Sequence, residues 1–205
     1  MNDTVTIALV DDDAAVLDSL ALYLSSQGVT AVCFDCAESL LAALDGGARP
    51  ECIVSDIRLP GLSGLELLHR LKQHHSRVPF ILITAVGDID MAVGAIKTGA
   101  FDFIEKPFDE ARLLAAVESA VALRRRHAEK DAELERLRSR FNTLSARQRQ
   151  VMGLAAAGLS NKEIAFRLDI SPKTVENHRA WVMERMDAKS LADLVRIAMR
   201  IEEQF

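Results

Sequence analysis

Residues 5–13 read VTIALVDDD, a β-branched and apolar run that is followed directly by three aspartates. Such a run without polar alternation is typical of a strand that is buried on both faces of a sheet. Similar runs follow at 29–34, 52–55, 80–83 and 101–104, and segments with apolar residues at helical spacing separate them. The pattern predicts an α/β, doubly wound domain, in which helices cover both faces of a five-stranded parallel sheet.

Length and composition limit the remaining possibilities. The chain has 205 residues, of which 49% are hydrophobic and 27% charged, as is typical of a globular protein with one or two domains. No apolar run approaches the ~18–20 residues that a membrane span requires, and residues 1–4 lack the basic start of a signal peptide. The three cysteines are too few for a disulfide framework, which favours a reducing, cytoplasmic location.

Charge is distributed unevenly along the chain. Residues 1–123 carry 8 basic and 18 acidic side chains, a net charge of −10, whereas residues 124–141 have a net charge of +3 and residues 142–205 one of +2. An acidic front and a mildly basic back indicate two modules with different partners. We therefore predict a first domain over 4–123, a helical linker over 124–141 and a small all-α domain over 142–205.

The linker contains neither glycine nor proline. Its apolar residues fall on alternating three- and four-residue steps, which form a short heptad seam from Ala120 to Phe141. His127 and Lys130 occupy two positions of this seam. Two interpretations therefore remain open: a solvated helical connector, or a helix that pairs with a second copy of the chain.

A set of polar residues lies where the predicted strands end: Asp11, Asp12, Asp13, Asp56, Thr84 and Lys106. The carboxyl ends of parallel strands meet at one edge of the sheet, where ligands bind in doubly wound folds. Carboxylates that converge there would repel one another unless a cation intervened. Mg²⁺ suits such oxygen ligands, and a lysine supplies a charge for a bound phosphate. The sequence therefore predicts phosphoryl chemistry on a carboxylate.

Each of these residues also has a purely structural interpretation. Asp13 is expected to cap the helix that begins at Ala14. Asp56 could begin a turn before Pro60, and Lys106 could belong to an ordinary extended X-Pro step. Each residue alone favours the structural interpretation, whereas their common position at strand ends favours a site.

Four stretches resemble the receiver domain of bacterial two-component response regulators: VDDD at 10–13, SDIRLPG at 55–61, ITA at 83–85 and FIEKPF at 103–108. The resemblance covers residues from about 4 to 123. It implies a flavodoxin-like fold. It also implies that Asp56 accepts a phosphoryl group from a partner histidine kinase and that Lys106 binds this group.

The same resemblance implies a set of Mg²⁺ ligands: Asp11, Asp12, Asp56 and the backbone carbonyl of Arg58. Thr84 and Phe103 stand where the family has its switch hydroxyl and its switch aromatic side chain. Phosphorylation is expected to draw Thr84 inward and to let Phe103 rotate inward, which would change the surface of the fourth helix and the fifth strand.

Residues 142–205 show helical periodicity only. Ser160 is expected to cap a short helix, with Glu163 three residues later, and Ser171-Pro172 begins the next helix. Two helices that are joined by a tight turn, the second of them polar at its start, predict a helix-turn-helix at about 161–180.

The second of these helices would present a set of polar residues to DNA: Lys173, Thr174, Glu176, Asn177, His178 and Arg179. Lysine, arginine and threonine suit phosphate contacts, whereas asparagine can bind adenine and glutamate can accept a hydrogen bond from cytosine. Trp181 is expected to pack this helix onto the domain. The alternative is a helical hairpin in an ordinary bundle, since a net charge of +2 is low for a DNA-binding domain.

Three further stretches resemble the LuxR/NarL-type DNA-binding domain: LSARQRQV at 144–151, GLSNKEIA at 158–165 and ISPKTVENH at 170–178. The helices of that family would cover about 142–203. Gln148 departs from the pattern, because the family usually has a glutamate there. If that glutamate orients an arginine, this domain lacks an ion pair.

Together the two resemblances imply a phosphorylation-activated transcription factor rather than an enzyme. The expected partners are a sensor histidine kinase, a second copy of the chain when phosphorylated, duplex DNA with two half-sites, and RNA polymerase. Residues 102–108 and 143–151 further resemble the branch that activates nitrogen-fixation genes under an oxygen-sensing kinase; a paralogue with another stimulus is the alternative. Two rivals are a phosphatase with Asp56 as covalent nucleophile, and a receiver whose second domain binds RNA or protein.

Overall fold

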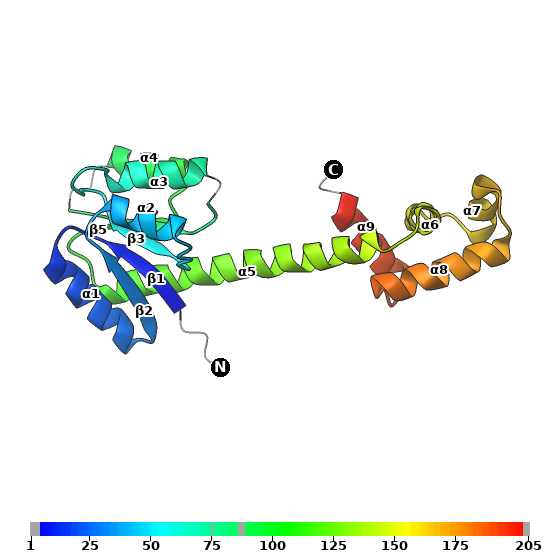
Figure 1. Ribbon diagram of the computed structural model, residues 1–205, viewed down its shortest axis with the longest axis horizontal. Helices are drawn as coiled ribbons and strands as arrows, with labels where there is room; N and C mark the ends of the chain where they lie inside the picture. The colour runs from blue at the N-terminus through cyan, green and yellow to red at the C-terminus, as the bar shows by residue number, and fades with distance from the viewer. Residues whose placement is uncertain (1–4, 75, 86–88, 203–205) are drawn as a thin grey trace. The chain divides into compact units, whose positions relative to one another are not determined.

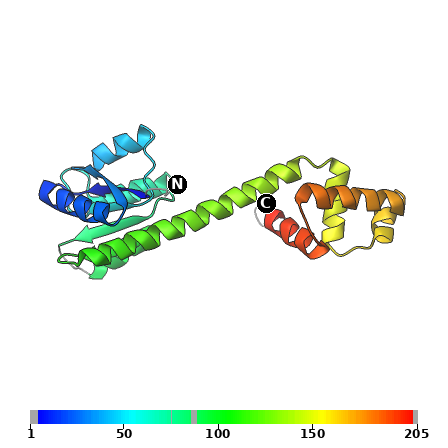
Figure 2. The same ribbon diagram turned by 90° about the horizontal axis from the view of Figure 1, so that it is seen from below.

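The computed structural model describes residues 5–74, 76–85 and 89–202. The chain divides into two compact units between His127 and Ala128. Figure 1 and Figure 2 show the elements of both units from two directions. None of the helices in these ranges is both long and apolar enough to cross a membrane.

The first unit is built on a parallel sheet with the strand order β2-β1-β3-β4-β5. The strands are β1 (Val5–Val10), β2 (Val29–Phe34), β3 (Ile53–Asp56), β4 (Phe80–Thr84) and β5 (Asp102–Glu105). The predicted doubly wound sheet of five parallel strands is therefore confirmed. β3 and β5 each begin and end one residue later than the predicted runs at 52–55 and 101–104.

Helices cover both faces of this sheet. They are α1 (Ala14–Ser26), α2 (Ala37–Asp45), α3 (Gly64–Gln73), α4 (Ile89–Thr98) and the start of α5 (Glu110–Asn142). α1 and α5 bury leucines such as Leu24 and Leu113 against one face, and α2 and α3 bury Leu40 and Leu67 against the other. Figure 1 shows these two layers around the strands.

The helix starts follow the signals in the sequence. The Asp13 side chain accepts a hydrogen bond from the Ala15 amide at 2.9 Å, so the predicted cap of α1 is confirmed. Ser63 and Glu66 form a capping box at α3. Each cap satisfies amide groups that the first turn of a helix leaves without partners.

The second unit contains helices only among its described residues. They are the end of α5, α6 (Ala146–Ala156), α7 (Asn161–Leu168), α8 (Pro172–Met186) and α9 (Leu191–Glu202). Their shared core includes Val151, Ile164, Val175, Val182 and Leu194. The predicted all-α second domain is therefore confirmed.

α5 spans the whole of the predicted linker, and its two ends belong to different cores. Ala120 is fully buried in the core of the first unit, and Phe141 packs against the core of the second. The guanidinium of Arg149 lies 5.1 Å from the centre of the Phe141 ring and donates to the carbonyl of Asn142. Two positions of the heptad seam therefore already have partners within the chain, which leaves a short seam for pairing with a second copy.

Candidate functional site

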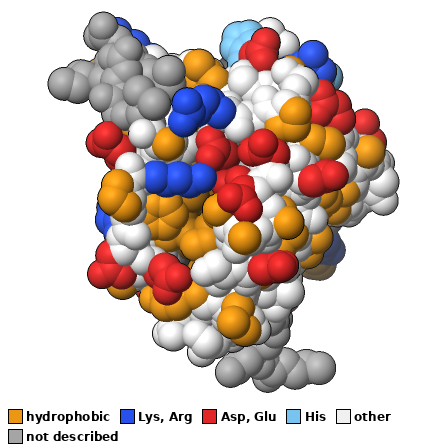
Figure 3. Space-filling view, turned by 90° about the vertical axis from the view of Figure 1, so that its left-hand side faces the viewer, with side chains coloured by type: hydrophobic (Ala, Val, Ile, Leu, Met, Phe, Trp, Pro, Cys, Tyr) orange, Lys and Arg blue, Asp and Glu red, His pale blue; other side chains and the backbone are white. Residues whose placement is uncertain are grey.

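The predicted polar residues of the first unit lie at the carboxyl ends of neighbouring strands. Asp11 follows β1, Asp56 ends β3 and Lys106 follows β5. The strand order reverses between β1 and β3, which is where doubly wound folds bind ligands. Figure 3 shows acidic side chains gathered on this end of the first unit, with lysine or arginine side chains beside them.

Lys106 joins the two carboxylates of this edge. Its Nζ lies 2.6 Å from Oδ2 of Asp56 and 3.0 Å from Oδ2 of Asp11. Both aspartates are buried, with 8% and 6% of their surface exposed. The structure therefore brings together three residues that lie up to 95 positions apart in the sequence.

The charge of Lys106 is stabilised by its partners. Burial alone would lower the pKa of this lysine, but the hydrogen bonds and charges of Asp56 and Asp11 outweigh burial, so that the pKa is raised above its ordinary value. Lys106 is consequently a cation throughout the physiological range. It offsets one of the two negative charges that this edge buries.

The backbone fixes the other oxygen of each carboxylate. Oδ1 of Asp56 accepts a hydrogen bond from the Arg58 amide at 2.8 Å, and Oδ1 of Asp11 accepts one from the Asp13 amide at 3.0 Å. Carboxylates that are held in this way have few rotamers available. The edge is thus preorganised before any ligand binds.

The donor set at this edge suits Mg²⁺ in part. Two carboxylates with one ammonium leave a net charge of −1, and Mg²⁺ uses one or two carboxylates with water and phosphate oxygens. Asp12 does not join the pair: it is exposed, and no hydrogen bond links it to Asp11 or Asp56 in the described ranges. Successive side chains at a strand end point to opposite sides, which accounts for the difference between Asp11 and Asp12.

No three-residue metal cluster is assembled within the described part of the chain, where no group of three or more His, Cys, Asp or Glu side chains is placed to hold an ion. Of the predicted Mg²⁺ ligands, Asp11 and Asp56 lie on either side of the Lys106 ammonium. The side chain of Arg58 is exposed, as expected for a residue predicted to contribute its carbonyl.

The two predicted switch residues flank this edge. Thr84 ends β4, is 2% exposed, and accepts a hydrogen bond at its carbonyl from the Lys106 amide at 2.6 Å. Phe103 in β5 is half-buried against the core that α2 and α3 share. Thr84 thus has a buried hydroxyl next to the Lys106 backbone, and Phe103 has a partly buried ring. Both positions are compatible with the expected roles of switch hydroxyl and switch aromatic side chain.

Two residues with no role in the predicted site lie against the Asp56 backbone, and a third holds the loop that follows it. The Ser55 hydroxyl donates to the Asp56 carbonyl at 2.8 Å. Gly64 lies so close that a Cβ there would come 2.2 Å from the same carbonyl oxygen. The Glu38 carboxylate of α2 accepts a hydrogen bond from the Leu62 amide at 3.2 Å. A glycine in the first turn of a helix was the one signal available for Gly64.

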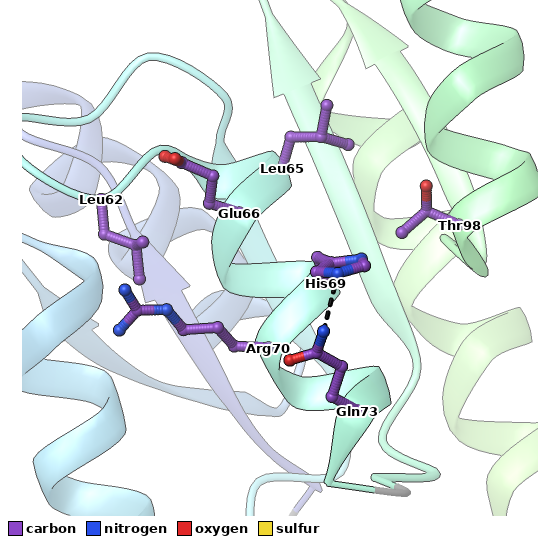
Figure 4. A pocket seen from close by; sticks show the side chains of 7 residues that line it. All are labelled: Leu62, Leu65, Glu66, His69, Arg70, Gln73 and Thr98. Atoms are coloured by element: carbon purple, nitrogen blue, oxygen red, sulfur yellow. Dashed lines mark hydrogen bonds between the residues drawn. The ribbon is translucent and has the colours of Figure 1, made fainter.

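A separate pocket of about 480 Å³ lies between α3 and α4 (Figure 4). Leu62, Leu65, Glu66, His69, Arg70, Gln73 and Thr98 line it. The His69 and Gln73 side chains form one hydrogen bond at 2.9 Å, as Figure 4 shows. None of the predicted site residues lines this pocket, so it is not the site that the sequence predicts.

In the second unit, α7 and α8 form the predicted helix-turn-helix layout. Ser160 and Glu163 form the expected capping box, and Ser171 caps α8 with Pro172 in its first turn. Asp169 ends α7 with a φ of 51°, in the left-handed region that a tight turn between helices requires.

The residues predicted to contact DNA lie along the start of α8 with different partners. The Lys173 ammonium pairs with Glu176 at 2.9 Å on the solvent side. The Arg179 guanidinium donates to the Asn161 side chain of α7 at 2.7 Å. Asn177 is exposed, and Thr174 and His178 are half-buried. Arg179 therefore braces the two helices, whereas Asn177 presents its amide to solvent.

One expectation about this unit needs correction. Trp181 is 53% exposed, so the expectation that it packs α8 onto the domain is wrong. Val175, Val182 and Met186 bury that face instead, one helical step away from Trp181. Gln148 completes a capping box with Ser145, so glutamine performs at this helix start a role that a glutamate also performs.

Comparison with protein families matches both units. Residues 7–118 match the family "Response regulator receiver domain", and residues 142–198 match "Bacterial regulatory proteins, luxR family". The chain is 48% identical to the transcriptional regulatory protein FixJ of Bradyrhizobium diazoefficiens, over 95% of this chain and 94% of that protein. It is 38% identical to the response regulator protein TmoT of Ectopseudomonas mendocina, over 99% and 92%.

Solved structures give the same result. The response regulator StyR matches with a TM-score of 0.83 at 38% identity, over 98% of both chains. Full-length FixJ from B. japonicum matches with a TM-score of 0.60 at 47% identity, over 97% of both chains. The chain therefore belongs to the family of two-component response regulators in which a receiver domain precedes a LuxR-type DNA-binding domain, and members of this family regulate transcription.

Proposed function

We propose that Asp56 accepts a phosphoryl group from a sensor histidine kinase and that the phosphorylated chain pairs with a second copy to bind DNA. The observation that carries this proposal is the position of Lys106, whose ammonium lies between the carboxylates of Asp56 and Asp11. An acceptor carboxylate, a second carboxylate and a fixed cation at one edge are the groups that phosphoryl transfer requires.

In the proposed transfer, an Asp56 carboxylate oxygen bonds to phosphorus while the bond from phosphorus to the kinase histidine nitrogen breaks. Lys106 then donates to the phosphoryl oxygens, which take over from the carboxylate as its partner. The product adds roughly −1.5 to −2 charge beside Asp11. Mg²⁺, when bound, would neutralise that charge, with the ligands Asp11, Asp12, Asp56 and the backbone carbonyl of Arg58.

We propose that Thr84 and Phe103 transmit the change. A hydroxyl at the end of β4 can donate to a phosphoryl oxygen that the unmodified carboxylate lacks. Movement of Thr84 would open space into which Phe103 can rotate. The Phe103 ring is half-buried, which is compatible with one orientation towards solvent and one towards the core. The surface that would change is the one formed by α4 and β5.

For the output, we propose that the start of α8 enters the major groove of duplex DNA and that two copies occupy two half-sites. Lys173, Thr174, Glu176, Asn177 and His178 would contact the DNA, and Arg179 would hold α8 against α7. Two linked copies gain effective concentration, which compensates for the modest positive charge of the domain. Such an activator would act on RNA polymerase in the cytoplasm.

The proposed stimulus follows from similarity alone. Three proteins named FixJ are 42–48% identical to this chain over nearly its whole length, which supports a role in nitrogen fixation or oxygen response under a FixL-like kinase. The alternative is a paralogue that responds to another stimulus. Its support is the 38% identity to TmoT over 99% of the chain.

The test uses the full chain and acetyl phosphate with Mg²⁺. Mass spectrometry should find one phosphoryl adduct at Asp56, absent in Asp56→Asn, and gel filtration should show pairing only in the phosphorylated sample. Gel shifts against duplex DNA and RNA then identify the output. Multiple turnover of small phosphate esters would favour a phosphatase, and an unmodified Asp56 after incubation with a competent kinase would exclude the proposal.

A further inference from the structure

Helix α7 presents an aromatic ring to solvent. Phe166 is 92% exposed, although its neighbours Ile164 and Ala165 are buried in the core. Lys162, four positions before Phe166 and so its neighbour on the helix surface, and Arg167 are both exposed as well. Burying such a ring is worth about 1.5–3 kcal/mol, so a phenyl group left in water is a strong potential contact.

A shallow hollow of about 430 Å³ surrounds this ring, lined by Leu159, Lys162, Glu163, Phe166 and Arg167. We refer to these residues as the Phe166 hollow. The Glu163 carboxylate is turned back to its own helix start, where it accepts from the Ser160 amide at 2.7 Å and from the Ser160 hydroxyl at 2.6 Å. Glu163 therefore keeps its negative charge close to the helix start, and the rim has a net positive charge from Lys162 and Arg167.

An apolar ring between two cations fits a protein surface that has carboxylates around an apolar depression. Phosphates of DNA would satisfy the cations but would leave the ring without an apolar partner, since apolar contacts with DNA are made to bases in the groove. Aromatic and arginine side chains are also the residues that contribute most to protein interfaces. Charge complementarity and the exposed ring together favour an acidic protein.

We propose that the Phe166 hollow is the docking site for an acidic protein surface of the transcription machinery. This inference rests on the proposed function, because it assigns to α7 a contact made after α8 has bound DNA. The hollow is thus expected to matter for the step that follows DNA binding and not for DNA binding itself.

The test measures two affinities of the full chain after treatment with acetyl phosphate. The first is for a DNA duplex selected in vitro with the wild-type chain, and the second is for bacterial RNA polymerase holoenzyme added to that complex. The variants are Phe166→Ala, Phe166→Leu, which keeps an apolar side chain, and Arg167→Gln. Leu22→Ala is the matched control, because Leu22 is an apolar residue of the first unit that is 75% exposed.

Phe166→Ala should bind the duplex within twofold of wild type and bind polymerase about tenfold more weakly, and Phe166→Leu should restore most of the loss. Arg167→Gln should weaken polymerase binding about threefold. Equal polymerase binding by all variants, or none by the wild-type complex, would overturn the inference and leave the proposed function intact. A tenfold loss of duplex binding in Phe166→Ala would instead place the ring on DNA. A selection with the wild-type chain that enriches no duplex would refute the proposed function itself.

Discussion

The acidic edge of the sheet and the exposed start of α8 hold their polar side chains in opposite ways. Asp11, Asp56 and Lys106 come from three strand ends, are largely enclosed and bond to one another. The α8 residues come from two turns of one helix and largely face solvent. A charge that loses its partner in an enclosed site has no water to replace it, whereas an exposed side chain does. The effects of substitutions at the acidic edge should therefore depend on one another, whereas the effects of substitutions on α8 should be independent and add.

The largest expected effect is that of Lys106→Met. It leaves two buried carboxylates without their cation and removes the charge that stabilises the transferred phosphoryl group, so phosphorylation should slow by about 100-fold or more. The measurement is a mass-spectrometric time course with acetyl phosphate and Mg²⁺. Lys72→Met is the matched control, because Lys72 is partly buried in the same unit and no carboxylate among the described residues pairs with it. Similar rates for both variants would remove Lys106 from the mechanism.

The same lysine should make stability depend on pH under alkaline conditions. Burial lowers the pKa of Lys106, but Asp56 and Asp11 raise it above the ordinary 10.5, so the folded chain holds this proton more tightly than the unfolded chain does. Its contribution is complete below pH 10.5 and is lost as the pH rises through the folded pKa. Urea unfolding should show a constant difference between wild type and Lys106→Met at neutral pH that shrinks only above this value. A difference that is already shrinking near neutrality would contradict the pairing.

A third test asks whether backbone packing, and not only charge, organises the edge. Gly64→Ala would place a methyl group against the Asp56 carbonyl, where a Cβ has only 2.2 Å. Overpacking of this kind costs about 1–3 kcal/mol and should also displace the acceptor, so that phosphorylation slows. Gly94→Ala in α4 is the control, because a Cβ there meets nothing within 4 Å and should stabilise the helix by about 0.5–1 kcal/mol. Equal unfolding midpoints for the two variants would refute the close approach.

Both regions could be predicted from sequence, but to different depths. The strands were visible as apolar runs, and the position of Asp56 and Lys106 at strand ends followed from the parallel topology alone. The different burial of Asp11 and Asp12 did not, because it depends on the direction in which each side chain leaves the strand end. The contact of Gly64 with Asp56 is also a tertiary distance that no local pattern encodes.

On α8 the limit was side-chain orientation. The caps at Ser160 and Ser171 followed from residue types, because capping is local. Trp181 was expected inside and lies largely outside, since a shift of one residue moves a side chain about 100° around a helix. The bond between Arg179 and Asn161 joins residues of two helices, so composition could only suggest that Arg179 was free for DNA.

A smaller effect should distinguish a residue of α8 that contacts DNA bases from a residue that holds α8 against α7. Asn177→Ala should weaken binding to the selected duplex by about 1 kcal/mol, at the low end for a base contact, and leave unfolding unchanged. Arg179→Ala should weaken binding and also destabilise the second unit, because it leaves the Asn161 side chain without its partner. Gel shifts and thermal unfolding of the full chain measure both quantities. If both variants lost the same duplex affinity and the same stability, Arg179 and Asn177 would not differ in role.

The smallest expected effect tests how far the order of the acidic edge extends. Glu38 of α2 accepts from the Leu62 amide in the loop that joins Asp56 to α3, through one partly buried hydrogen bond of 3.2 Å. Glu38→Ala should cost about 0.5 kcal/mol and speed hydrogen exchange at the Leu62 amide, whereas Glu38→Gln keeps an acceptor oxygen and should preserve protection. If the loop also positions the Arg58 carbonyl, Glu38→Ala should raise the Mg²⁺ concentration needed for half-maximal phosphorylation without changing the maximal rate. If the Leu62 amide exchanged at the same rate in Glu38→Ala as in wild type, Glu38 would not order this loop, and the ordered region would be limited to the strand ends.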